Sequence, residues 1–229
     1  MQIKHIVLIM LPAILLTTIS VKAQFVTPLT TISGPAEVTT VDGKTYTGKL
    51  KNAMFGTNGI MSFKLKDDEG NDTKFKAADV AQLKLKVDGL AKIEIVAEQS
   101  TNISKLAHSN FKEVVDREYI YWQRVKSPDK DKYYLLQLLN PGFDDLLKVY
   151  DLPNSKSGET SVGDISVSGN TSTAYYVVKN GKTLKITKKK YKKQDFKLLF
   201  EDCPQIIENN KPDFKSFAEH VFFYNERCK

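Results

Sequence analysis

The strongest charge pattern in the sequence is a lysine run near its C-terminal end. The run consists of Lys188, Lys189, Lys190, Lys192 and Lys193. Ammonium groups held close together can bind phosphate or carboxylate groups, and Tyr191, which lies among them, could add a flat apolar surface. The alternative is a solvated turn whose lysines discourage aggregation at a sheet edge. The sequence marks these lysines as candidate anion-binding residues and leaves that alternative open.

The two cysteines, Cys203 and Cys228, are a candidate disulfide. An even cysteine number is typical of a disulfide in an oxidising compartment, and two unrelated thiols are the alternative. Asp202-Cys203-Pro204 indicates a helix start, because proline is favoured at the first helical position. If a short helix begins there and the next helix runs antiparallel to it, Cys203 and the C-terminal tail lie on the same side. If Cys203 instead ended a helix, Cys228 would lie roughly 20 Å away. We expect the first geometry.

Residues suited to catalysis or metal binding are few. The sequence contains no complete phosphate-binding loop, nucleophile elbow or zinc-protease motif, and only two histidines follow residue 23. The acidic segment 67–72 could hold calcium, but it lacks the ligand spacing of an EF-hand. We therefore predict no catalytic residue, no metal and no cofactor. A hydrolase that pairs Glu118 with Asp144 or Asp145 is the alternative.

The first 23 residues predict export. A positive Lys4 precedes the apolar run Ile6–Ile19, and Val21-Lys22-Ala23 has the form of a cleavage site. The run of 14 residues is too short for a membrane span, which needs about 20. Cleavage before Gln24 would leave 206 residues with a net charge of +5 instead of +7 and no transmembrane segment. We expect a periplasmic or cell-surface protein, and a positive excess suits anionic partners.

Turn signals and hydrophobic periodicity predict an α+β protein that is mainly β. The expected units are a signal peptide, 1–23; a linker, 24–33; an SH3-like or Sm-like small barrel or curved sheet, 34–90; a central antiparallel meander, 91–191, with a mobile loop at 154–172; and a C-terminal helical cap, 192–229. Alternating apolar residues predict the strands, and a change of period to 3.6 predicts the helices. The serine-rich and glycine-rich composition of the loop is the reason to expect mobility.

Individual segments give sharper predictions within these units. Asp42-Gly43 and Asn180-Gly181 each predict a two-residue hairpin turn. Lys92–Glu98 alternates as a strand does, whereas Tyr133–Leu139 is apolar at six of seven positions. A strand that is apolar on both faces lies in the middle of a structure.

Several short motifs resemble a broad group of uncharacterised exported proteins of Bacteroidetes-type bacteria. The motifs are Val41–Gly48, Phe75–Val80, Tyr175–Gly181, the lysine run, Asp202-Cys203-Pro204 and Tyr224-Asn225. The resemblance implies the envelope of a Gram-negative cell, carries no known activity and supplies no catalytic residues.

These observations favour a non-catalytic exported binding or scaffolding protein of the bacterial envelope. Its expected partner is an envelope protein, a glycan or an anionic lipid, and not nucleic acid. The alternatives are the carboxylate-pair hydrolase and a protein that binds anionic lipid through the lysine run.

Overall fold

The computed structural model describes residues 23–28, 33–56, 59–87, 89, 92, 116–152 and 174–228. Three predicted features lie outside these residues: the signal peptide apart from Ala23, the strand at 92–98 apart from Lys92, and the loop at 154–172.

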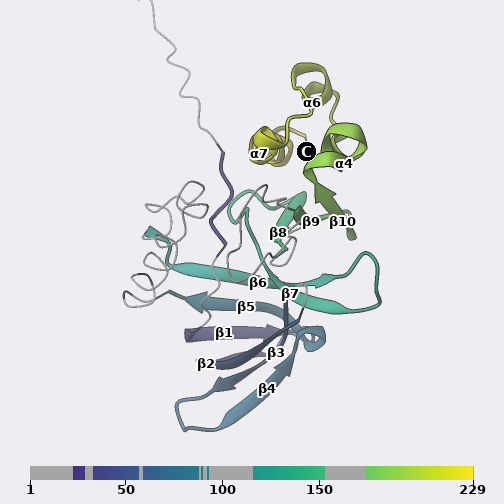
Figure 1. Ribbon diagram of the computed structural model, residues 1–229. Helices are drawn as coiled ribbons and strands as arrows, with labels where there is room; N and C mark the ends of the chain where they lie inside the picture. Colours follow the sequence, from purple (N-terminus) through teal and green to yellow (C-terminus); the bar gives the residue numbers. More distant parts are fainter. Residues whose placement is uncertain are drawn as a thin grey trace, which may run out of the picture.

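Six antiparallel strands close into a barrel (Figure 1). The strands in this part of the fold are β1 Gly34–Thr40, β2 Thr45–Gly56, β3 Gly59–Lys66, β4 Asp72–Lys76, β5 Val80–Lys86, β6 Tyr119–Lys126 and β7 Tyr133–Gln137. Their order is β2-β1-β5-β6-β7-β3-β4, and a further β2–β3 pairing closes the ring and leaves β4 as an added edge strand. The predicted mainly-β fold with a small barrel is confirmed. Its last two strands come from the region expected to form a separate meander.

A bend in β2 allows this closure. The first half of β2 pairs with β1, and the second half pairs with β3. Between them Asn52 has a positive φ of 44°, and the β2–β3 register shifts after Lys51. Such bulges bend a strand and increase its twist, so one strand can serve both neighbours. Inside the ring, apolar side chains from alternate positions form the core, including Val38, Phe63 and Trp122.

The two hairpin predictions have different outcomes. At Asn180-Gly181 both residues have positive φ, 50° and 73°, and Lys179 pairs with Lys182, so this two-residue turn is confirmed. The other connection is a three-residue loop, 41–43, because Thr40 donates its N–H to the carbonyl of Lys44. Gly43 has a φ of 84° and Asp42 is not in the positive-φ region. The turn lies where predicted, but its type was wrong because one left-handed glycine suffices for this loop.

A second sheet lies between the barrel and the C-terminal helices (Figure 1). It consists of β8 Leu147–Asp151, β9 Ala174–Lys179 and β10 Lys182–Thr187, in the order β10-β9-β8. Tyr150 and Tyr176 face the barrel and pack with Leu136 of β7, whereas Val149 and Val177 face the helices. As its composition predicts, β7 is therefore apolar on both faces, with Leu135 in the barrel core and Leu136 outside it.

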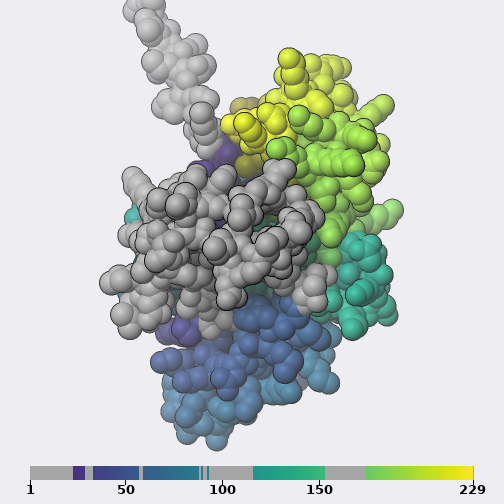
Figure 2. Space-filling view, in the orientation of Figure 1, coloured from purple at the N-terminus to yellow at the C-terminus, as the bar shows by residue number. Residues whose placement is uncertain are grey.

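The C-terminal helices cover the outer face of this second sheet. In Figure 2 the C-terminal residues, in green and yellow, form the end of the molecule opposite the strands drawn in blue. They are α4 Lys188–Lys190, the π-helical segment η2 Tyr191–Asp195, α5 Phe196–Phe200, α6 Pro204–Asn209, the short 3₁₀ segment η3 Phe214–Ser216 and α7 Phe217–Arg227. Phe196, Leu199 and Phe200 form the predicted apolar face of the first helical run. No helix among the described residues has both the length and the apolar character needed to cross a membrane.

The segment before β1 packs against both sheet regions and the helical cap. Val26 donates its N–H to the carbonyl of Leu139 at 2.8 Å, and Arg117 donates to the carbonyl of Thr27 at 2.8 Å. The ring of Phe25 meets those of Tyr175 and Phe217 edge to face at 5.4 and 5.5 Å. Residues 25–27, within the predicted linker 24–33, therefore pack against the folded chain.

Asp151, at the end of β8, gives a prediction about pH. Burial raises the pKa of its carboxyl to about 6, and a hydrogen bond from the Leu152 backbone only partly offsets this. Between the ordinary and the raised pKa the folded state binds more protons than the unfolded state, so stability falls as the pH rises through this window. Asp151→Asn should therefore raise the free energy of unfolding at pH 7 by about 2–3 kcal/mol and leave it nearly unchanged at pH 4.

Urea denaturation at both pH values measures this difference. Asp131→Asn is the matched control, because the side chain of Asp131 is 90% exposed. An equal gain at both pH values would contradict the burial argument.

Candidate anion-binding face

The predicted lysine run lies at the start of the C-terminal helices. Lys188, Lys189, Lys190, Lys192 and Lys193 are all exposed, on α4 and η2. Tyr191 is fully buried, however, and packs against Phe196 and Phe217. The expectation that Tyr191 adds a flat surface beside the lysines is wrong, because the helical period turns this residue into the core. The run is a row of ammonium groups without an aromatic partner at that position.

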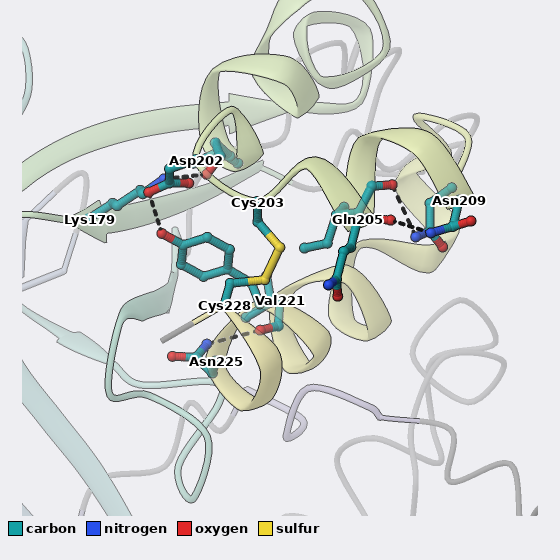
Figure 3. Close-up of a disulfide and its surroundings, with 12 residues drawn as sticks. Lys179, Asp202, Cys203, Gln205, Asn209, Val221, Asn225 and Cys228 are labelled. Atoms are coloured by element: carbon teal, nitrogen blue, oxygen red, sulfur yellow. Dashed lines mark hydrogen bonds and ion pairs between the residues drawn. A yellow bond between two sulfur atoms is a disulfide. The ribbon is translucent and has the colours of Figure 1, made fainter.

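Cys203 and Cys228 form a disulfide, with their Cα atoms 5.7 Å apart (Figure 3). Cys203 is the residue before α6, with Pro204 at the helix start as predicted, and Cys228 follows the last residue of α7. The bond therefore joins the N-terminal end of one helix to the C-terminal end of the other.

Polar contacts beside this disulfide hold the helical cap to the sheet (Figure 3). Lys179 Nζ lies 2.8 Å from Asp202 Oδ1, and the Tyr224 hydroxyl donates to Asp202 Oδ2 at 2.8 Å. Burial alone would raise the pKa of Asp202, but the hydrogen bonds from Lys179 and Tyr224 lower it below the ordinary value. All three groups are used in joining β9 to the helices.

Three other carboxylates among the sequence candidates have local partners. Glu118 accepts a hydrogen bond from the neighbouring Tyr119 hydroxyl, which raises the pKa of that tyrosine. Asp144 forms an ion pair with Lys148 at 3.4 Å. In the acidic turn, Asp67 accepts hydrogen bonds from the backbone and the side chain of Asn71 at 2.7 and 3.2 Å. These contacts give each carboxylate a role in its own turn or strand.

The largest organised charge in the described residues is a grid of lysines on the outer face of β2, β3 and β4. Directly opposed residues of antiparallel strands share a face, and this pairing places lysines in adjacent rows. Lys51 lies opposite Lys64, and Lys64 lies opposite Lys74. The lysine grid consists of Lys49, Lys51, Lys64, Lys66, Lys74 and Lys76. The alternate residues between them, Leu50, Leu65 and Phe75, point into the barrel.

Repulsion between the lysines of the grid lowers the stability of the fold. Like charges directly opposite each other on a sheet are destabilising, and the row Lys51–Lys64–Lys74 contains two such pairs. The one described ion pair within the grid joins Lys64 to Asp72 at 3.4 Å, with both side chains nearly half exposed, so it offsets little. Edge strands use lysines against aggregation, which accounts for β4 but not for β2 or β3, whose two sides are both paired.

A groove of about 380 Å³ lies next to the lysine grid. Its lining comes from the outer faces of β2, β1 and β5, the start of β6 and the β3–β4 turn. Pro35 provides a low floor, with Lys49 on one side and Lys86 on the other. Lys49 therefore belongs to both the lysine grid and this groove.

Aromatic side chains lie at the β6 end of the groove. Tyr119 lines it, and Lys84 Nζ lies 4.2 Å from the centre of the Tyr119 ring. The Tyr121 ring lies beside that of Tyr119, with centres 6.5 Å apart. The hydrogen bond to Glu118 and the Lys84 contact fix the position of the Tyr119 ring.

Searches of protein-family models, of curated proteins and of solved structures gave no match to this chain. The arrangement of its own residues is therefore the basis for a functional proposal.

Proposed function

We propose that this is an exported, non-catalytic binding protein of the bacterial envelope, which holds an anionic polymer on the outer face of its barrel. The observation that carries the proposal is the lysine grid. Six lysines lie on three adjacent strands, with backbones about 5 Å apart across the strands and about 7 Å apart between alternate residues of one strand. Such a face suits a flexible polymer with repeated negative charges.

Several other observations support the same proposal. Repulsion between the opposed lysines lowers the stability of the free protein, and a bound polyanion would remove that repulsion. This combination is typical of a binding surface. The N-terminal sequence has the form of a signal peptide, and the disulfide suits an oxidising compartment.

The test compares two variants of equal charge. In Lys51→Gln/Lys64→Gln/Lys74→Gln the middle row of the grid is neutral, whereas Lys188→Gln/Lys189→Gln/Lys190→Gln removes the same charge from α4. The two sites lie at opposite ends of the molecule (Figure 2). A lysine at an anionic surface contributes about 1 kcal/mol, so the grid variant should bind dextran sulfate roughly 10–100-fold more weakly. The α4 variant should bind it as the unchanged protein does.

Affinity is measured by fluorescence anisotropy with labelled dextran sulfate, and neutral dextran controls for the sugar backbone. The measured affinity should fall as salt is raised. Equal losses in both variants would mean that net charge alone governs binding and would contradict the proposal.

The lysine run supports a second candidate function, the binding of anionic lipid. Five exposed lysines lie on α4 and η2, and the half-exposed Leu198 lies on α5, which follows directly. Vesicles that contain anionic lipid test this candidate with the same two variants. Only the α4 variant should lose vesicle binding if the run serves this purpose.

A substitution that removes repulsion within the lysine grid should increase stability and weaken polyanion binding. In Lys51→Glu the pair with Lys64 becomes attractive, so the free energy of unfolding at low salt should rise by about 0.5–1 kcal/mol. Dextran sulfate affinity should fall in the same variant. Urea denaturation at low and high salt measures the first effect, which should shrink at high salt. A loss of stability at low salt would contradict the charge argument.

A further inference from the structure

We propose that the groove beside the lysine grid binds one acidic sugar unit, a ring that carries hydroxyl groups and a carboxylate or phosphate. This inference rests on the proposed function, because it assigns a chemical class to the polymer that the lysine grid holds. The grid accounts for attraction to any polyanion, and the groove adds selection for a sugar.

The shape of the groove suits a ring. Its volume of about 380 Å³ lies within the range of small-molecule sites, about 300–1,000 Å³. The floor is low because Pro35, which lies between Lys49 and Lys86 across the strands, has a short, rigid side chain. Gly48 lines the groove through its backbone alone, because it pairs with the buried Ala36 and an added Cβ would point inward, against the Lys66 carbonyl and Leu65.

The charged side chains that line the groove favour an acidic group on the ligand. Lys49, Lys84 and Lys86 contribute three positive charges to the lining, against two negative charges from Glu37 and Asp68. Lys84 and Glu37 are directly opposed across β1 and β5, so they neutralise each other in part. Lys49 and Lys86, on opposite sides of the Pro35 floor, remain to pair with a carboxylate or phosphate.

The two carboxylates in the lining favour a ligand with hydroxyl groups. Carboxylates accept hydrogen bonds and repel other anions, so Glu37 and Asp68 would oppose a bare chain of phosphates at this place. A sugar ring instead supplies hydroxyl donors next to its acidic group. The mixed lining therefore fits an acidic sugar better than a simple polyanion.

Tyr119 provides the surface against which a ring can pack. The Glu118 hydrogen bond and the Lys84 ammonium hold its ring in place before any ligand binds. An aromatic side chain with few rotatable bonds gives contact area at low entropic cost. The groove thus combines an apolar face, hydroxyl acceptors and paired ammonium groups.

Isothermal titration of the disulfide-bonded protein with four defined probes tests the inference. The probes are a trigalacturonate, glucose 6-phosphate, inorganic phosphate and neutral maltotriose. We expect a measurable heat from one or both acidic sugars and none from phosphate or maltotriose at the same concentration. The trigalacturonate and the sugar phosphate distinguish a carboxylated polymer from a phosphorylated one. If inorganic phosphate binds as tightly as both acidic sugars, or if neither acidic sugar binds, the inference is overturned.

Three substitutions test whether the acidic sugar binds in the groove. Tyr119→Ala and Lys86→Gln should each weaken acidic-sugar binding roughly five- to tenfold. Tyr133→Ala is the matched control, because Tyr133 has the same type of cation contact, with Arg124 at 3.6 Å, away from the groove. Lys86 is exposed and its substitution should leave the fold intact, so it remains informative if Tyr119→Ala is unstable.

Binding of dextran sulfate tests the proposed function separately from the groove inference. Its binding should depend on Lys51, Lys64 and Lys74 but change less than twofold in Tyr119→Ala. If dextran sulfate binds through the lysine grid and the acidic sugars do not bind, the groove inference fails alone. If the grid substitutions leave dextran sulfate binding unchanged, the proposed function fails.

Discussion

Replacing Asn225 by leucine is expected to lower the free energy of unfolding by about 3–5 kcal/mol. The amide of Asn225 is buried in α7, and its Oδ1 accepts the backbone N–H groups of Leu146 and Leu147 at 2.7 and 3.1 Å. Its Nδ2 donates to the carbonyls of Leu147 and Val221 at 3.3 and 2.9 Å. Leucine has a similar size but leaves two N–H groups without their partner, and each costs about 1–3 kcal/mol.

Asn209 in α6 is the control for this substitution (Figure 3). Its Nδ2 donates to the carbonyl of Gln205 at 2.8 Å, which repeats the local bond from Asn225 to Val221. Asn209 is exposed and, in the described contacts, has no bond like those to β8. Asn209→Leu should change stability by less than about 0.5 kcal/mol. Urea denaturation compares the two, and similar effects would mean that the contacts with Leu146 and Leu147 are not decisive.

Removing the disulfide is expected to lower the free energy of unfolding by about 3 kcal/mol. The bond between Cys203 and Cys228 closes a loop with a sequence separation of 25. Without the bond the unfolded chain gains conformational freedom, which is the main origin of the stabilisation in the chain-entropy model. The double substitution Cys203→Ser/Cys228→Ser removes both thiols together and avoids new pairings.

Thermal denaturation with and without a reducing agent measures this effect. Reduction should destabilise the unchanged protein and should not affect the double-serine variant. A reductant effect of equal size in both proteins would show that it does not act through this bond. Hydrogen exchange should increase first in α6 and α7, since the bond joins these two helices.

Local sequence signals predicted local structure well. Asn180-Gly181 supplies two residues that tolerate positive φ, and the turn forms there with the expected length. Cys203-Pro204 correctly marks the start of α6, because proline has no N–H to lose at that position. The apolar composition of Tyr133–Leu139 correctly indicates burial on both faces of β7.

The closing of the barrel could not be predicted in the same way. Alternation tells which face of a strand is buried but does not name its neighbours. β5 and β6 are adjacent in the sheet although residues 87–118 separate them in the sequence. Tertiary packing decided these pairings, and the five-strand pattern within 34–90 gave no sign that two later strands would complete the ring.

The lysine grid was missed for a related reason, although a signal for it exists. Lysines at positions i and i+2 occur on three successive strands, as Lys49/Lys51, Lys64/Lys66 and Lys74/Lys76. Period two places each pair on one face, and two short turns fix the alignment of the strands. The run at 188–193 is more visible because it is continuous, yet its helical period distributes its residues between the surface and the core.

The placement of β6 and β7 between β5 and β3 has a consequence for how the chain folds as it emerges. Synthesis delivers the polypeptide in order from its N-terminal end, so β1 to β5 appear while their final neighbours are still missing. During that interval β5 and β3 each expose an unpaired edge, the arrangement most prone to intermolecular strand pairing. The ring can close only after Gln137, the last residue of β7, has become available. Nascent chains that stop before that residue should aggregate. Chains that include all of β7 can close the barrel, so they should not pair with other copies through these edges.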